Sequence, residues 1–112
     1  MRIAVPREIK PLEGRVGLIP AACSELVAAG HEAYVQRGAG QLSGYADSAY
    51  TDVGAQLVDD AASAYAQGEL IVKVKEPIKD EWQYLRSDHV LFGYLHLAAN
   101  MDLANTLCDI GL

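Results

Sequence analysis

The sequence predicts an α/β fold with a doubly wound, mainly parallel sheet and helices on both faces. Short apolar segments rich in β-branched residues alternate along the chain with segments of helical character. Parallel strands need such helical crossovers, whereas antiparallel strands are joined by short turns. The chain has 112 residues, 51% of them hydrophobic and 21% charged, close to the average of globular domains. Disorder and fibrous repeats are excluded, and one domain or a part of a larger protein is expected.

Five segments are expected as strands. Residues 1–6 are a short apolar opening that ends at Pro6, because proline lacks the donor of a sheet ladder. Residues 70–75, Leu-Ile-Val-Lys-Val-Lys, have the β-branched and alternating pattern of a strand, and Pro77 follows them. The other three expected strands are residues 33–37, 56–58 and 90–95.

Helical segments are expected between these strands. Residues 20–29 have a proline in the first turn and end before Gly30, a typical start and stop. Residues 59–67 are expected to form a helix capped by Asp59 or Asp60. Further helical segments are expected in a short stretch capped by Asp47, over residues 79–86 and over about 101–109.

A glycine-rich loop over residues 38–44 partly resembles a dinucleotide-binding fingerprint. Its spacing is G-x-G-x-x-x-G, and no helix is expected to begin inside it and present an N-terminus to a pyrophosphate. Because glycines serve any tight loop, we interpret the segment as a structural turn.

Composition excludes several classes of protein. A net charge of −6 argues against a nucleic-acid surface, which would need a basic stripe. No apolar run reaches the roughly 20 residues of a membrane span, and the N-terminus lacks the pattern of a signal peptide. Cys23 and Cys108 lack the paired spacing of a zinc module or a disulfide framework. We expect a cytoplasmic protein without a metal, nucleic-acid or membrane partner.

The parallel topology brings three distant positions together as a candidate site. All strands of a parallel sheet end at one edge, and ligands bind outside those carboxyl ends. Lys75 ends its strand, His96 follows the last strand, and Arg15 lies in the charged loop that leaves the first. Arginine binds a carboxylate with two hydrogen bonds, lysine polarises a carbonyl, and histidine transfers protons near neutral pH. This set fits a small keto or amino acid better than a phosphate-rich ligand.

The same residue types also have structural uses. An arginine in a charged loop and a lysine at a strand end are often solvated, and a histidine after a strand often packs or caps. Two-residue alternation predicts that Lys73 shares a face with Lys75, and we interpret Lys73 as a pairing or surface-reaching residue. Tyr94 either presents its hydroxyl to the site or belongs to the core. Glu76 either orients a ligand or neutralises the local positive charge.

Longer segments resemble one enzyme family. The opening MRIAVPREIKPLEGRVGLIP and the later segments VKVKEP and LFGYLHLAA are similar to alanine dehydrogenases, whose family also contains the alpha subunit of proton-translocating nicotinamide nucleotide transhydrogenase. The resemblance covers essentially the whole chain. Two departures are visible. The family usually has asparagine at the position of Leu12, and an R-V-A-x-[S/T]-P run where this chain has Gly17 and Ile19.

The resemblance implies an NAD-dependent oxidoreductase that reversibly converts L-alanine and water to pyruvate and ammonium, with a Rossmann-like or flavodoxin-like substrate domain. Matched to the family pattern, Arg15 would bind the substrate carboxylate and Lys75 would contact the substrate and polarise its carbonyl or imine. His96 would act as general acid or base. Glu76 and Tyr94 match positions near the substrate.

The resemblance also implies a part of a longer enzyme. Family chains are several times longer, are typically hexameric, and split the substrate domain around an NAD-binding domain. Residues 1–112 match the first substrate-domain segment, so we expect the NAD-binding domain to be absent and this segment alone to lack turnover. Two alternatives remain, part of a transhydrogenase alpha subunit and a non-catalytic α/β binding module. Lys75 and the Tyr94–His96 stretch look more like the alanine enzyme.

Overall fold

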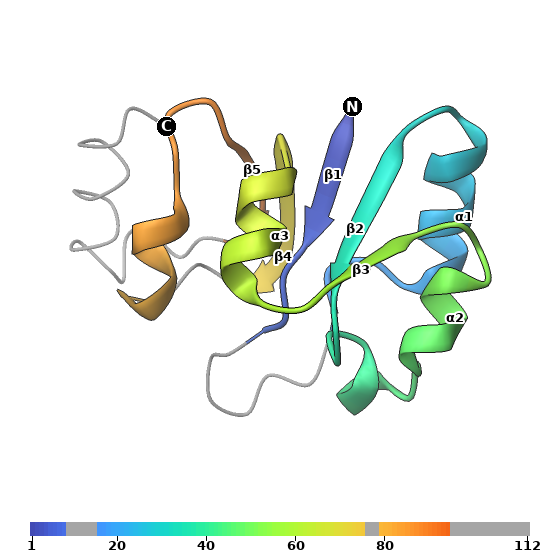
Figure 1. The fold of residues 1–112 in the computed structure, drawn as a ribbon. Coiled ribbons are helices and arrows are strands. Elements are labelled where there is room, and N and C mark those ends of the chain that lie inside the picture. Colours follow the sequence, from blue (N-terminus) through green and yellow to red (C-terminus); the bar gives the residue numbers. More distant parts are fainter. Residues whose placement is uncertain (9–15, 76–78, 95–112) are drawn as a thin grey trace.

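The computed structural model describes residues 1–8, 16–75 and 79–94, and a five-stranded sheet lies at its centre (Figure 1). The strand order is β3-β2-β1-β4-β5, and all four neighbouring pairs are parallel. The predicted α/β fold is confirmed. The strands are β1 (Arg2–Val5), β2 (Glu32–Gln36), β3 (Gln56–Val58), β4 (Leu70–Lys75) and β5 (Val90–Tyr94).

Helices cover both faces of the sheet. The α-helices are α1 (Pro20–Ala28), α2 (Asp47–Thr51) and α3 (Ala61–Gln67), and the 3-10 helices are η1 (Gln41–Ser43) and η2 (Lys79–Tyr84). Figure 1 shows α1 and α2 behind one half of the sheet and α3 in front of it. Successive strand residues point to opposite faces, so β1 serves two cores. Val5 packs with Cys23 of α1 in one core, and Ala4 packs with Tyr65 of α3 in the other.

The helix ends follow from local chemistry, with one correction. Pro20 occupies the first turn of α1, and the Oδ1 atom of Asp60 accepts a 2.8 Å hydrogen bond from the Ser63 N–H at the start of α3. Of the two aspartates considered, Asp60 is therefore the cap. The prediction that Asp47 caps α2 is wrong. The N-cap position is Ala46, and the Asp47 carboxylate accepts a 2.8 Å hydrogen bond from the Gly38 N–H instead.

The glycine-rich loop after β2 is a tight turn packed against α2, with one correction: the 3-10 helix η1 begins inside it at Gln41, where no helix was expected. Gly38 has a φ of 79°, a conformation that side chains other than glycine rarely adopt. A Cβ atom added at Gly40 would lie 2.8 Å from the Tyr50 ring, so the loop packs closely against α2. With the Gly38 N–H donated to Asp47, the loop is held by its own neighbours rather than shaped around a phosphate.

The order of the strands creates a switch point beside β1. The chain passes from β1 through α1 to β2 on one side, and through α3 from β3 to β4 on the other. Open α/β sheets bind ligands outside the carboxyl ends of their strands at such a point. Here those ends are the residues that follow Val5 and the last residues of β4, including Lys75.

Candidate functional site

The structure brings two of the predicted site residues to adjacent strand ends. Lys75 ends β4 and Tyr94 ends β5, and their Cα atoms are partners in the parallel register. Arg15, Glu76 and His96 lie outside the described residues, as does the helix expected at 101–109. The described part of the site is therefore the backbone of β4 and β5 at the switch point, together with the residues packed around it.

The chain that follows Arg15 lies directly against β4. Val16 is buried in the core on the α1 side of the sheet. At Gly17 an added Cβ atom would lie 2.5 Å from the carbonyl oxygen of Val72, so the two backbones are in close contact. Since Val72 is three residues before Lys75, the loop leaving β1 returns to the sheet next to the end of β4.

An irregularity in β4 precedes Lys75. Val72 pairs with Phe92 and Lys75 pairs with Tyr94, so β4 contains one residue more than β5 over this interval. The shift interrupts the two-residue alternation on which the shared face of Lys73 and Lys75 was predicted. A Cβ atom at Gly93, opposite the irregularity, would collide with the Lys73 carbonyl oxygen. Bulges of this kind are common next to active sites, where they re-aim a side chain.

A buried ion cluster lies behind this irregularity. The Lys73 Nζ atom is 2.9 Å from Glu81 Oε2 and 3.4 Å from Glu8 Oε1, and all three side chains are at most 4% exposed. The Tyr65 hydroxyl donates a 2.8 Å hydrogen bond to Glu81 Oε2, and the Val74 N–H donates a 3.1 Å hydrogen bond to Glu8 Oε2. Of the two interpretations of Lys73, the ion-pairing one is therefore confirmed, and the one in which its side chain reaches the surface is wrong.

Tyr65 remains a neutral hydroxyl donor in this cluster. Burial raises the pKa of Tyr65, and the neighbouring Glu81 carboxylate raises it further through its charge and its hydrogen bond. The ring also stacks on Tyr84, with centroids 5.6 Å apart. The hydroxyl therefore keeps its proton and donates a hydrogen bond to Glu81 throughout the ordinary pH range.

Sequence reasoning missed Glu8 and Glu81. Each lies in a charged stretch that is typical of a solvated segment, and nothing in the local pattern separates them from their neighbours. The only signal was indirect, because Lys73 interrupts an apolar strand and needs an anionic partner if it is buried.

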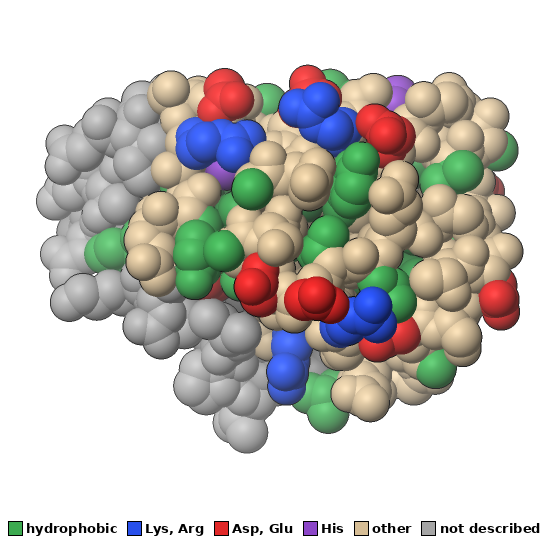
Figure 2. Space-filling model, in the orientation of Figure 1, with side chains coloured by type: hydrophobic (Ala, Val, Ile, Leu, Met, Phe, Trp, Pro, Cys, Tyr) green, Lys and Arg blue, Asp and Glu red, His purple; other side chains and the backbone are tan. Residues whose placement is uncertain are grey.

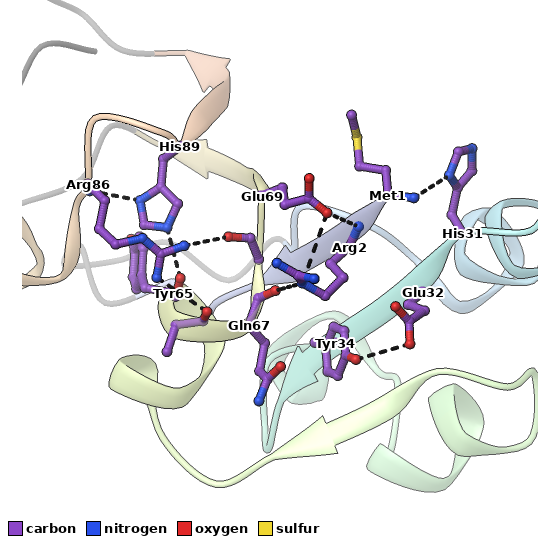
Figure 3. Close-up of polar contacts among 12 residues, drawn as sticks. Met1, Arg2, His31, Glu32, Tyr34, Tyr65, Gln67, Glu69, Arg86 and His89 are labelled. Atoms are coloured by element: carbon purple, nitrogen blue, oxygen red, sulfur yellow. Dashed lines mark hydrogen bonds and ion pairs between the residues drawn. The ribbon is translucent and has the colours of Figure 1, made fainter.

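The opposite, amino-terminal end of the sheet carries a different set of polar contacts (Figure 3). Arg2 donates from Nε to the carbonyl oxygen of Gln67 at 2.9 Å, and its backbone N–H donates to Glu69 Oε1 at 3.0 Å. Arg86 donates to the carbonyl oxygens of Ala66 and Gly68 at the end of α3, each at 3.2 Å. These contacts satisfy backbone hydrogen-bonding groups at the ends of a strand and a helix.

His89 belongs to this amino-terminal set. Its Nδ1 atom accepts a 2.9 Å hydrogen bond from the Arg86 N–H, and its Nε2 atom donates a 2.8 Å hydrogen bond to the Tyr65 carbonyl oxygen. The two partners fix the neutral tautomer with its proton on Nε2. Burial, as the largest cause, lowers the pKa of His89. We therefore interpret this histidine as a structural residue.

The described residues offer no second candidate site for a polar ligand or a metal ion. A cavity of about 260 Å³ between α1 and the sheet is lined by apolar residues and glycine, including Leu26, Val72 and Phe92. On the face shown in Figure 2, acidic and basic side chains of the described residues alternate rather than form one patch. The described residues contain no group of three potential metal ligands. No helix among them is long and apolar enough to cross a membrane.

The comparisons with known proteins agree with this fold. Residues 4–112 match the family model described as "Alanine dehydrogenase/PNT, N-terminal domain". The chain belongs to this family.

Relatives in the family match nearly all of this chain. It is 45% identical over 112 residues to the alanine dehydrogenase of Bacillus subtilis and 43% identical over 111 residues to that of Mycobacterium tuberculosis (strain H37Rv). These alignments cover 100% and 99% of this chain but 29% and 30% of the relatives. The chain therefore spans less than a third of their length.

Two solved structures have the same fold as this family member. An L-alanine dehydrogenase superposes with a TM-score of 0.96 at 44% identity, covering 98% of this chain and 30% of that one. A transhydrogenase from Sinorhizobium meliloti superposes with a TM-score of 0.91 at 28% identity, covering 100% of this chain and 32% of that one.

Two departures from the usual family pattern have local structural consequences. Glycine at position 17, where the resemblance led us to expect alanine, permits the close contact with the Val72 backbone. Ile19 occupies the N-cap position of α1 without a side-chain hydrogen bond, where the resemblance led us to expect a serine or threonine. Serine and threonine are among the preferred N-caps, so α1 begins without the stabilising contact that either would supply.

Proposed function

We propose that this chain is the first substrate-binding segment of an NAD-dependent alanine dehydrogenase. The complete enzyme would convert L-alanine, NAD and water to pyruvate, ammonium and NADH. The observation that carries the proposal is the position of Lys75, which ends β4 at the switch point and is paired in register with Tyr94. The names of the two curated relatives support the same activity.

In this proposal the charged groups act on a small 2-oxo or 2-amino acid. The Arg15 guanidinium binds the substrate carboxylate through two hydrogen bonds, which fixes the orientation of the substrate. The Lys75 ammonium donates to the carbonyl or imine and stabilises the negative charge that develops there. His96 transfers the proton as general acid or base. Glu76 and Tyr94 lie next to these groups in the sequence and contact the substrate.

The glycine-rich loop after β2 is a poor fit to a dinucleotide. The glycine-rich loop after β2 commits its Gly38 N–H to Asp47 and packs Gly40 against Tyr50, so it does not form a phosphate cradle. The proposal therefore assigns NAD to a domain outside residues 1–112, and NAD supplies the hydride acceptor. The protein is expected to be a cytoplasmic homo-oligomer whose partner is a small-molecule substrate.

Substitution of the three charged groups tests the proposal. In the complete natural protein that contains this sequence, Arg15→Ala, Lys75→Ala and His96→Ala are each expected to lower kcat/KM for alanine oxidation by about a hundredfold or more. Arg2→Ala is the matched control, because it removes an arginine at the opposite end of the sheet, and it should leave the rate unchanged. Nearly unchanged rates for Lys75→Ala and His96→Ala would refute the assigned site.

The transhydrogenase reading remains the second candidate, since the Sinorhizobium meliloti structure has a TM-score of 0.91. Its identity to this chain is 28%, compared with 44% for the L-alanine dehydrogenase structure. Steady-state assays distinguish the two activities. Alanine-dependent reduction of NAD by the unsubstituted protein supports the dehydrogenase. Hydride exchange between the two nicotinamide nucleotides, without a response to alanine, supports the transhydrogenase.

A further inference from the structure

The ion cluster of Glu8, Lys73 and Glu81 connects the segments that bear the proposed substrate groups. Glu8 follows β1 and begins the segment that continues to Arg15, and Lys73 lies two residues before Lys75 in β4. Glu81 lies in η2, which begins three residues after Glu76. The Lys73 ammonium contacts both carboxylates, at 3.4 Å and 2.9 Å. One buried cation therefore joins the end of β4 to η2, which follows it closely, and to the segment after β1, which is far away in the sequence.

Stability alone does not account for such a cluster. Removing an ion from water costs several kcal/mol, and replacing a buried ion pair or triad by well-packed apolar residues is often neutral or stabilising. The neighbouring core on this face contains apolar residues such as Ile71 and Leu85, which show that such packing is available here. A buried charged cluster is better explained by the arrangement that it specifies.

That arrangement is the irregularity at the end of β4. An extra residue in a strand disrupts the ladder and leaves a backbone group in need of a partner. The Val74 N–H donates to Glu8 Oε2, while the other oxygen of the same carboxylate contacts the Lys73 ammonium. Glu8 therefore binds two successive residues of β4 within the interval where the register shifts. The register that results pairs Lys75 with Tyr94.

We propose that Glu8, with Lys73 and Glu81, is a positioning residue that fixes the backbone register of Lys75 for substrate binding. This inference rests on the proposed function, because Lys75 must contact the substrate for its register to matter. Glu8 and Glu81 act through β4 and η2 and do not touch the substrate. Loss of either carboxylate should therefore raise the KM for the substrate and leave the KM for the nucleotide unchanged.

Steady-state kinetics of the complete natural protein test this division. Glu8→Gln keeps the size of the side chain and an oxygen for the Val74 N–H, but it removes the charge that Lys73 contacts. We expect the KM for pyruvate to rise by about ten- to a hundredfold, because displacement of a positioning group by about 1 Å costs up to a hundredfold in rate. The KM for NADH should stay within about twofold of the unsubstituted value.

Two further variants separate positioning from folding. Glu81→Gln preserves an acceptor for the Tyr65 hydroxyl and leaves Lys73 paired with Glu8, so it provides the test if Glu8→Gln does not fold. It should raise the KM for pyruvate in the same direction by a smaller factor. His89→Gln is the matched control, since it removes a buried group at the opposite end of the sheet. It should lower the Tm without changing the KM for pyruvate.

The outcomes distinguish the two proposals. An active unsubstituted protein with an unchanged KM for pyruvate in a folded Glu8→Gln or Glu81→Gln variant would overturn the positioning inference alone. A rise of the same size in His89→Gln would also overturn it, because the effect would then follow stability. An unsubstituted protein that does not reduce NAD with alanine would overturn the proposed function, whatever the variants do.

Discussion

The two ends of one sheet use charged residues in opposite ways. At the amino-terminal end, the Arg2 and Glu69 side chains are 47% and 46% exposed, and Arg2 also contacts main-chain oxygen (Figure 3). At the carboxyl end, Lys73 and its two carboxylates are almost completely buried. Exposed contacts of this kind cost little free energy to form and contribute little to the stability of the fold. Buried charges are costly, and this fold has them where parallel sheets bind their ligands.

Removal of one cation from each end is the strongest test of this contrast. Lys73→Met leaves two buried carboxylates without their ammonium partner, so we expect the free energy of unfolding to fall by about 3–5 kcal/mol. Arg2→Met removes an exposed cation and should cost about 1 kcal/mol or less. Urea denaturation followed by circular dichroism measures both values. Equal losses would mean that the two ends do not differ energetically.

A single methyl group tests how closely the loop after β1 packs on β4. In Gly17→Ala the new Cβ atom would begin 2.5 Å from the Val72 carbonyl oxygen, so the loop or the strand must shift. We expect a loss of about 1–3 kcal/mol in the free energy of unfolding, the usual cost of overpacking. Because the loop leads back to Arg15, the KM for pyruvate should rise as well. A variant of unchanged stability and KM would contradict the close contact.

Most of the fold could be predicted because its signals are local. The pattern of Leu70–Lys75 predicted a strand with the observed bounds, and Pro20 predicted the start of α1. Parallel topology then predicted that Lys75 ends its strand at the edge where the other strands end, and in the structure Lys75 ends β4 with Tyr94 as its partner in register. The roles of Arg15 and His96 stay predictions, since both residues lie outside the described part of the chain.

The ion cluster and the irregular register could not be predicted from local pattern. Glu8 and Glu81 meet Lys73 only after β1, β4 and η2 have packed together, and along the sequence they look like solvated charges. The alternation rule assumed an uninterrupted β4, whereas the extra residue before Lys75 depends on an acceptor that comes from Glu8. Tertiary contacts therefore decided both features.

The pH dependence of stability sharpens the comparison from the amino-terminal end. Because burial lowers the pKa of His89 below its ordinary value of 6.5, the folded protein favours the neutral ring more than the unfolded chain does. The contribution of the neutral His89 ring to the free energy of unfolding is therefore complete above pH 6.5, and it is lost as the pH falls below that value. Urea denaturation at pH 7 and at about pH 5 measures the loss. His89→Gln should abolish this part of the pH dependence, and an identical profile in the variant would contradict it.

The smallest expected effect is a gain at the start of α1. Ile19 is 43% exposed at the N-cap position and makes no side-chain cap hydrogen bond. Ile19→Ser supplies a side-chain oxygen that can accept from an N–H of the first turn, and we expect a gain of about 0.5–1 kcal/mol in the free energy of unfolding. Ile19→Ala is the matched control without the hydroxyl group. A gain of the same size in both variants would show that capping is not its cause.

The bonding of His89 has a practical consequence for labelling experiments. Both of its ring nitrogens form hydrogen bonds, and the residue is only 4% exposed, so its lone pair is not free to attack an acylating reagent and His89 should not be modified. Of the three histidines in the chain, His31 and His96 are then left as targets. If pyruvate protects the protein from inactivation by such a reagent, mass spectrometry needs to distinguish only two modified residues, His31 near the start of the sequence and His96 near its end.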